Sequence, residues 1–253
     1  ILGCVVLLAS GELSALGRKR LFNRNAGSQS ALSGAGNADR SAGPQVTWID
    51  AQRGERGGAM NGPGDYGRKL RLGLRERFYE IHVPRQYDGS KPVPAILVFH
   101  GGGSHPEAVR YESGMDATSD REGFIVIYPA GTNKKLLIRD RLLTWNDGRP
   151  YSDGSYNKTD DVGFVSAVLD DASKLFKIDQ KRVYAAGYSN GAQFTYRLAQ
   201  QLTNRLAAIA AVAGQRAADE MFHVPPRPIS VMQFAGIKDP LGPYYGGSAK
   251  SEK

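Results

Sequence analysis

The chain has 253 residues, of which 41% are hydrophobic and 23% are charged, and its formal net charge is +8. This composition excludes a wholly disordered chain, and the length suits one large domain or two small ones. No apolar run reaches the roughly 18 residues that a membrane-spanning helix needs, so we expect no stable membrane span in the sequence given.

The positive charge is concentrated in the N-terminal part. Thirteen Lys and Arg residues but only seven Asp and Glu residues occur up to Arg85. A nearly neutral remainder is a weak basis for nucleic-acid binding, and we expect no nucleic-acid partner.

Residues 1–9 form an apolar run that contains Cys4, the single cysteine of the chain. We predict that residues 1–17 are the remnant of an export signal, which implies a secreted or extracytoplasmic protein. A lipid anchor through Cys4 is an alternative, because residues 1–4 resemble a lipoprotein box. A short buried strand is the other alternative.

Residues 18–73 are rich in Gly, Ser and Arg and poor in large apolar side chains. Such a segment buries too little apolar surface to offset its ordering entropy, so we predict a disordered linker. The basic residues 68–71 are expected to form a solvated face. The folded domain is predicted over residues 74–253.

The domain alternates between short apolar runs and stretches with helical spacing. The expected strands cover residues 78–83, 94–99, 124–128, 182–186, 206–213 and 229–235, and the expected helices cover residues 160–176 and 190–202. This alternation predicts an α/β fold with a mainly parallel sheet.

The segment Gly187-Tyr188-Ser189-Asn190-Gly191 lies between an expected strand and an expected helix. A Gly-x-Ser-x-Gly sequence in this context indicates a nucleophile elbow, which exposes the serine on a sharp turn. We predict Ser189 as the nucleophile and the Asn190 N–H, at the start of the helix, as an oxyanion donor. An ordinary turn serine is the alternative.

A second motif, His100-Gly101-Gly102-Gly103, directly follows the strand expected over residues 94–99. Glycine N–H groups at a strand end can approach a carbonyl oxygen, which is typical of an oxyanion loop. We expect Gly102 to be the second donor, with Gly103 as the next choice. A flexible turn, or a phosphate loop without its lysine, would show the same sequence.

Asp239 follows the last expected strand, where the acid of a Ser–Asp–His triad is found in this chain order. Its carboxylate would orient and stabilise a catalytic imidazole. The alternative is an ordinary turn Asp before a proline.

These motifs resemble those of the polyhydroxybutyrate depolymerase-like esterases, which are grouped with the feruloyl and acetyl xylan esterases of the first carbohydrate esterase family. The resemblance rests on residues 160–164, 182–191, 100–103, 145–146, 213–214 and 236–247. It implies an α/β-hydrolase fold with helices on both faces of the sheet, secretion, and cleavage of polyester or plant cell-wall esters. It further implies the roles given above to Ser189, Asp239, Gly102 and Asn190.

We predict substrate contacts by two aromatic residues, the first of them on the basis of the resemblance. Trp145 would line the acyl pocket, although an aromatic side chain in such a domain is more often part of the core. Tyr188 would pack under the oxyanion loop beside the nucleophile.

The chain departs from the family at the catalytic histidine. Family members carry it in a segment well beyond the acid, but only 14 residues follow Asp239 and none is His. We therefore expect a truncated domain without its final strand and helix, nearly inactive as given, because losing the histidine costs about 10⁶ in kcat in a comparable triad. The histidines present, His82, His100, His105 and His223, are expected to be poor substitutes, with His100 bracing the oxyanion loop.

We expect no cofactor, because the sequence has no Cys/His cluster, phosphate-loop motif or dinucleotide fingerprint. A serine peptidase or thioesterase on the same fold remains an alternative, since the elbow does not select the leaving group. The alternative from another class is a non-catalytic binding protein that has lost the base.

Overall fold

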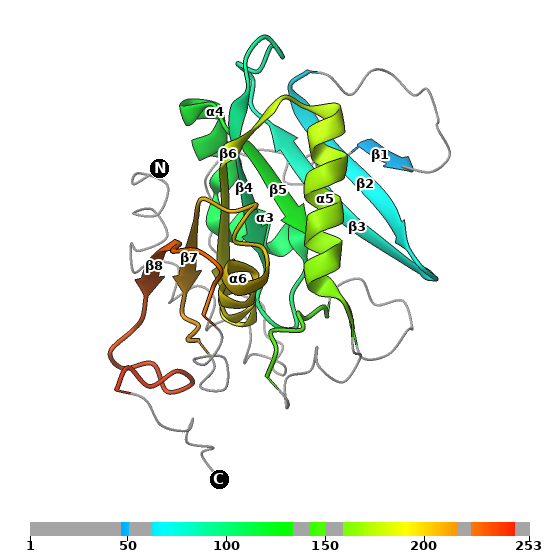
Figure 1. Cartoon of the computed structure of the whole chain (residues 1–253). Helices are drawn as coiled ribbons and strands as arrows, with labels where there is room; N and C mark the ends of the chain where they lie inside the picture. The colour runs from blue at the N-terminus through cyan, green and yellow to red at the C-terminus, as the bar shows by residue number, and fades with distance from the viewer. Residues whose placement is uncertain (1–46, 51–61, 134–141, 150–158, 217–223, 246–253) are drawn as a thin grey trace, which may run out of the picture.

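The computed structural model describes residues 47–50, 62–133, 142–149, 159–216 and 224–245. In this part of the chain eight strands form one sheet, in the order β1-β2-β3-β5-β4-β6-β7-β8 (Figure 1). The predicted signal remnant with Cys4, most of the predicted linker, and His223 lie outside the described residues.

The first side of the sheet is an antiparallel hairpin of β2 (Gly64–Leu72) and β3 (Arg75–Val83), with β1 (Thr47–Asp50) parallel to β2. The predicted linker is therefore wrong for residues 64–72, which form a paired strand. Tyr66 and Leu70, which lie on the same face of β2, pack against the core. The apolar alternation is not visible in the sequence because Arg68 occupies the position between them on that face.

Arg68, between those two residues, corrects a second expectation. Its side chain is not part of a solvated face but is 7% exposed, and it forms a bidentate ion pair with Asp171 at 2.8 and 2.9 Å. Asp171 lies on α5 (Asp161–Leu175), so the pair fastens the hairpin to that helix.

The other side of the sheet is parallel and holds the motifs. It consists of β5 (Ile125–Pro129), β4 (Val93–Phe99), β6 (Ile178–Tyr188), β7 (Ala208–Val212) and β8 (Ser230–Phe234). Each of these strands overlaps a strand expected from the sequence. Continuous apolar runs are typical of strands covered on both faces, as β4 and β5 are, whereas β8 is largely exposed.

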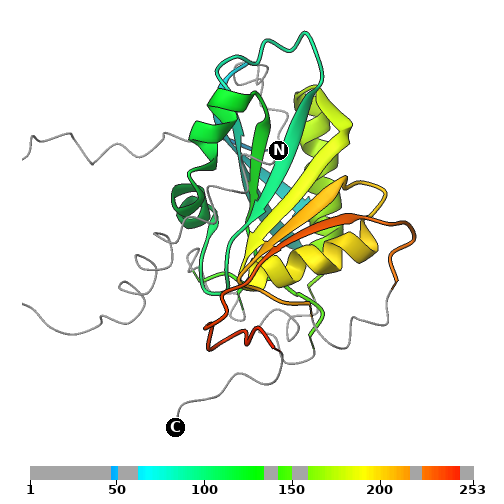
Figure 2. The same cartoon turned by 90° about the vertical axis from the view of Figure 1, so that its left-hand side faces the viewer.

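Helices cover both faces (Figures 1 and 2). On one face α5 and α6 (Asn190–Gln201) pack over the larger core cluster, which includes Phe99, Phe164 and Phe194. On the other face α3 (Pro106–Ser113) and α4 (Met115–Glu122) cover a smaller cluster. The predicted α/β architecture with helices on both faces is confirmed, but these two polar helices were not predicted, because their apolar positions are few.

The carboxyl ends of the parallel strands meet at one edge of the sheet. In the register, Phe99 at the end of β4 is opposite Gly187 of β6, and Val212 of β7 is opposite both Tyr188 and Phe234. The loops that carry the predicted motifs therefore leave the sheet at the edge where parallel sheets bind ligands. No helix within the described ranges is long and apolar enough to cross a membrane.

Candidate active site

Ser189 forms the turn between the end of β6 and the start of α6. Its backbone has φ 53° and ψ −119°, a conformation that residues other than glycine rarely adopt. The Ser189 N–H donates to the Val212 carbonyl oxygen at 2.9 Å, and the Ser189 carbonyl accepts from the Gln193 N–H at 3.0 Å. Bonds from β7 and α6 thus hold the strained turn, as a nucleophile elbow requires.

Gly187 and Gly191 let the strand and helix approach each other at this turn. A Cβ atom added at Gly187 would lie 2.4 Å from the Gly191 carbonyl carbon. A Cβ atom added at Gly191 would lie 2.5 Å from the carbonyl oxygens of Phe99 and His100. Both obstacles are backbone atoms, so no side-chain rotation could relieve the clash.

The glycine loop after β4 lies beside the start of α6. A Cβ atom added at Gly102 would be 3.4 Å from the Asn190 Cβ, so the two predicted oxyanion donors belong to neighbouring residues in space. The Gly103 N–H already donates to the Leu143 carbonyl at 2.8 Å. This bond favours Gly102 over Gly103 as the donor of the loop.

Tyr188 lies at the surface next to Ser189, with 51% of the residue exposed. A Cβ atom added at Gly101 would be 3.3 Å from Tyr188 Cδ1 and 3.5 Å from the Ser189 Cβ. The glycine loop therefore packs against both residues, and substrate contact by Tyr188 stays a prediction.

Trp145 is fully buried, with 0% exposure. Its indole stacks on Phe194 with ring centroids 4.9 Å apart, and its Nε1–H donates to the His100 carbonyl at 3.0 Å. A substrate-binding role needs an accessible ring, so this placement corrects the predicted acyl-pocket role in favour of the core alternative. Through its bond to the His100 carbonyl, the buried Trp145 supports the glycine loop from the core side.

His100 uses both ring nitrogens inside the protein. The Nδ1–H donates to the Gly101 carbonyl at 2.8 Å, and Nε2 accepts the Gly131 N–H at 3.0 Å. Burial lowers the pKa of His100 to about 4, so the ring is neutral at physiological pH. The predicted bracing role is confirmed, and His100 has no free nitrogen with which to serve as a base.

His82 belongs to a cluster of charged side chains on the sheet face under α3 and α4. Asp65, His82 and Asp116 offer three ligand atoms within 4.8 Å of one another. However, the buried Arg110 guanidinium donates to both carboxylates, and the Nδ1 of His82 lies 2.8 Å from Asp65 Oδ1. Because Arg110 already supplies the positive charge, we assign the cluster a structural role rather than a metal site.

His105 is the N-cap of α3, where its Nδ1 accepts the Ala108 N–H at 3.3 Å. This bond was not predicted, because Ser, Thr, Asp and Asn are the usual N-cap residues.

Asp239 lies in the loop after β8, at the same edge of the sheet as Ser189. Its Oδ1 accepts the N–H groups of Leu241 and Gly242 at 2.9 and 3.2 Å. The side chain is partly exposed. It therefore shapes its own turn, as the alternative interpretation expected, while its placement is also compatible with the predicted role as triad acid.

Gln215 connects the Asp239 loop to the Ser189 turn, a link that the sequence did not indicate because a single loop Gln carries no pattern. Its Nε2 donates to the carbonyls of Gly242 and Pro243 at 3.2 and 2.9 Å. The preceding residue, Gly214, packs so tightly that an added Cβ would lie 2.4 Å from the Ser189 carbonyl oxygen.

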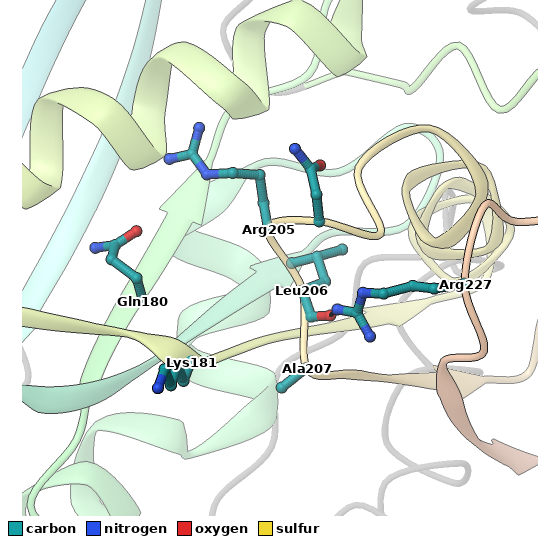
Figure 3. A pocket seen from close by; sticks show the side chains of 7 residues that line it. Gln180, Lys181, Arg205, Leu206, Ala207 and Arg227 are labelled. Atoms are coloured by element: carbon teal, nitrogen blue, oxygen red, sulfur yellow. Dashed lines mark hydrogen bonds between the residues drawn. The ribbon is translucent and has the colours of Figure 1, made fainter.

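A pocket of about 370 Å³ lies at the opposite edge of the sheet, near the starts of β6 and β7 (Figure 3). Lys181, Arg205 and Arg227 contribute to its lining. Arg227 donates to the Leu206 carbonyl at 2.6 Å, and Arg205 pairs with Asp170 at 2.8 Å. Two of the three cations thus serve the fold itself, and the pocket is separate from Ser189.

A mainly parallel sheet with helices on both faces, and a strained serine turn joining a central strand to a helix, define an α/β-hydrolase. Residues 79–241 match the family model described as Esterase PHB depolymerase. The chain belongs to this family, as the sequence motifs had suggested.

Individual relatives are esterases by name. NocK of Nocardia uniformis subsp. tsuyamanensis, which is named as a candidate esterase, is 31% identical over 183 residues, covering 71% of this chain and 50% of NocK. The bifunctional acetylxylan esterase/xylanase XynS20E of Neocallimastix patriciarum is 31% identical over 135 residues, covering 53% of this chain and 18% of its own length. The chain thus spans half or less of the length of these relatives.

A solved structure supports the fold. The crystal structure of a thermostable esterase superposes with a TM-score of 0.52 at 16% sequence identity, covering 70% of this chain and 48% of that one.

Proposed function

We propose that this protein hydrolyses carboxylic esters through an acyl-enzyme formed on Ser189. The observation that carries the proposal is the position of Ser189 on a strained turn at the start of α6, directly beside the glycine loop of residues 101–103. A nucleophile at that position has backbone N–H groups of the glycine loop and of the start of α6 nearby. Acyl transfer requires such groups to stabilise the negative charge on the carbonyl oxygen.

In the proposed reaction the Ser189 Oγ attacks the ester carbonyl carbon and transfers its proton to a base. The negative charge that develops on the carbonyl oxygen is stabilised by the N–H groups of Asn190 and Gly102. The alcohol then leaves with a proton, and water hydrolyses the acyl-enzyme by the same route in reverse order.

Asp239 is proposed to orient the imidazole that serves as this base. The sequence given contains no His after Asp239, and His100 is fully engaged by Gly101 and Gly131. A serine hydroxyl is a weak nucleophile without a base. The chain spans half or less of the length of its relatives, so the protein to assay is the product of the complete gene.

The proposed substrates are plant cell-wall acetyl or feruloyl esters, or polyhydroxyalkanoate-type polyesters. The names of relatives, which include an acetylxylan esterase and a feruloyl esterase, support the first class, and the family name supports the second. We also propose that the protein is exported, on the basis of the apolar N-terminal run.

The experiment is hydrolysis of short p-nitrophenyl esters by the complete gene product, together with covalent labelling by a fluorophosphonate. We expect Ser189→Ala to abolish both, and mass spectrometry to find the label on the peptide that contains Ser189. The matched control is Ser173→Ala, which removes a hydroxyl on α5 that donates to the Leu169 carbonyl, at a distance in the fold from the elbow.

Turnover that survives Ser189→Ala would refute the assignment of the nucleophile. A complete gene product that neither turns over esters nor accepts the label would favour the non-catalytic binding protein. Thioester and peptide substrates, assayed in parallel, separate the esterase from the thioesterase and peptidase alternatives.

A further inference from the structure

The side-chain amide of Asn190 makes hydrogen bonds on both its oxygen and its nitrogen, although the sequence singled out only its backbone. Its Oδ1 accepts from the Thr144 Oγ1 at 2.9 Å and from the Trp145 N–H at 2.8 Å. Its Nδ2 donates to the Trp145 carbonyl at 3.3 Å and to Asp147 Oδ2 at 2.7 Å. With 8% of the residue exposed, the amide is fixed by four bonds to one short segment.

That segment, residues 143–149, also holds the glycine loop. The Leu143 carbonyl accepts the Gly103 N–H at 2.8 Å, and the Trp145 Nε1–H donates to the His100 carbonyl at 3.0 Å. Both proposed oxyanion donors, Gly102 and Asn190, are therefore attached to the same stretch of backbone.

Asp147 is the charged end of this connection and is 1% exposed. Arg149 binds the Asp147 Oδ2 through Nε at 3.0 Å and Nη2 at 2.7 Å. The same Nη2 donates to the Gln193 Oε1 at 2.7 Å, and Gln193 lies in the first turn of α6. Asp147 and Arg149 thus link two residues of α6, Asn190 and Gln193, through consecutive hydrogen bonds.

We propose that the Asn190 side chain, anchored by Asp147, is a positioning element that sets the separation of the two oxyanion donors. The proposal rests on the proposed function of Ser189 and extends it. Asn is required because this position must accept two hydrogen bonds and also donate to a buried carboxylate. An Asp would keep the shape and both acceptors, but it would place a second carboxylate 2.7 Å from Asp147 Oδ2.

The test is the pH profile of Asn190→Asp relative to the natural sequence, measured with p-nitrophenyl esters on the complete gene product. Two carboxylates this close share a proton at low pH, and the protonated pair restores the lost hydrogen bond. We expect kcat to fall about tenfold to hundredfold at high pH with KM nearly unchanged, and the ratio to the natural sequence to recover as the pH falls.

The swap Asn190→Asp with Asp147→Asn supplies the rescue. It reverses the polarity of the bond and retains three of the four contacts of residue 190. The amide nitrogen introduced at position 147 cannot accept from Arg149, so the rescue is partial: at high pH we expect kcat above that of either single variant and below that of the natural sequence. Asn204→Asp, which makes the same change at an exposed turn residue, is the matched control and should leave the profile unchanged.

If Asn190→Asp does not fold at high pH, Thr144→Val removes one of the four bonds with little change of shape, and we expect a smaller fall in kcat without a change in KM. The proposal is overturned if kcat of Asn190→Asp falls equally at every pH and is not rescued by the swap. It is also overturned if kcat of Asn190→Asp equals that of the natural sequence. If Ser189→Ala abolishes turnover while these variants do not impair it, only the positioning role fails and the esterase proposal stands.

Discussion

The Nε2 atom of His100 accepts the Gly131 N–H across 3.0 Å, and this bond defines the protonation state of the ring. A nitrogen that accepts from a backbone N–H carries no proton, so His100 is held as the neutral tautomer protonated on Nδ1. The neutral ring therefore supports the glycine loop, and its protonation in acid should lower the free energy of unfolding.

His100 is expected to destabilise the fold in acid. Its folded pKa, about 4, lies below the ordinary value of 6.5, so the unfolded chain takes up the proton first as the pH falls. The neutral His100 ring makes its full contribution to the free energy of unfolding above about pH 6.5. This contribution is lost as the pH falls toward 4, and the loss amounts to roughly 3 kcal/mol. Denaturant titrations across this range should show that loss, and His100→Gln should remove it. An unchanged slope in that variant would contradict the assignment, and His105→Gln is the control.

His82 is expected to act in the opposite direction. Burial alone would lower its pKa, but its hydrogen bond to Asp65 and the charges of Asp116 and Asp120 raise the pKa above the ordinary value of 6.5. Its stabilisation is therefore complete below about pH 6.5 and is lost as the pH rises through the folded pKa. His82→Gln should flatten the free energy of unfolding between neutral and mildly alkaline pH. A loss of stability that is the same at every pH would refute the charge-based explanation.

Arg110 is expected to be essential to the same cluster. It is 5% exposed and pairs with Asp65, Glu80 and Asp116. Arg110→Met would leave the buried Glu80 and the partly buried Asp65 and Asp116 without this cation, which costs up to about 3–5 kcal/mol. Arg182→Met, which removes an ion pair with Asp179 at the surface, should cost at most about 1 kcal/mol. Thermal unfolding of the two variants measures both losses of stability. Equal losses would contradict an essential role for Arg110.

Gly191→Ala is expected to disrupt the elbow. Its methyl group would meet the carbonyl oxygens of Phe99 and His100 at 2.5 Å, so β4 and α6 would have to separate. We expect a loss above about 3 kcal/mol or failure to fold. Gly236→Ala, where the nearest atom is 3.6 Å away, is the control and should be nearly neutral. Circular dichroism and thermal melts decide the outcome.

Asp239→Asn should separate the chemical role of this residue from its role in the loop. The Asn Oδ1 can still accept from the N–H groups of Leu241 and Gly242, so stability should change little. If the proposed triad is correct, kcat of the complete gene product should fall by about 10⁴. Asp239→Ala should lose stability as well. Full activity in Asp239→Asn would remove Asp239 from the mechanism.

The parallel strands and the Ser189 turn could be predicted from sequence because each carries a local pattern. Apolar runs such as residues 94–99 and 124–128 read as buried strands, and glycines at fixed offsets around Ser189 mark a close approach. The family motif Asp160–Phe164 likewise corresponds to a helix start, where the Asp160 Oδ1 accepts the Gly163 N–H at 2.8 Å.

The remainder depends on pairings between residues far apart in the chain. β2 is stabilised by Arg68 binding Asp171, 103 positions away, and α3 carries the buried Arg110, whose partners come from β2, β3 and α4. The contacts of Asn190 with Thr144 and Asp147 are of the same kind. A single sequence contains no sign of such pairs. The sequence therefore could not show whether Trp145 lies in the core or lines the acyl pocket.

The glycine contacts around Ser189 also bear on how this protein can change over time. At Gly187, Gly191 and Gly214 the neighbours are mainly backbone atoms, so no compensating side-chain substitution can make room for a methyl group. These three positions do not tolerate a larger residue, whereas the exposed Leu241, in the loop after β8, faces no such restriction. Under the proposed function, new ester preferences would therefore arise by changes in the loops around an unchanged turn.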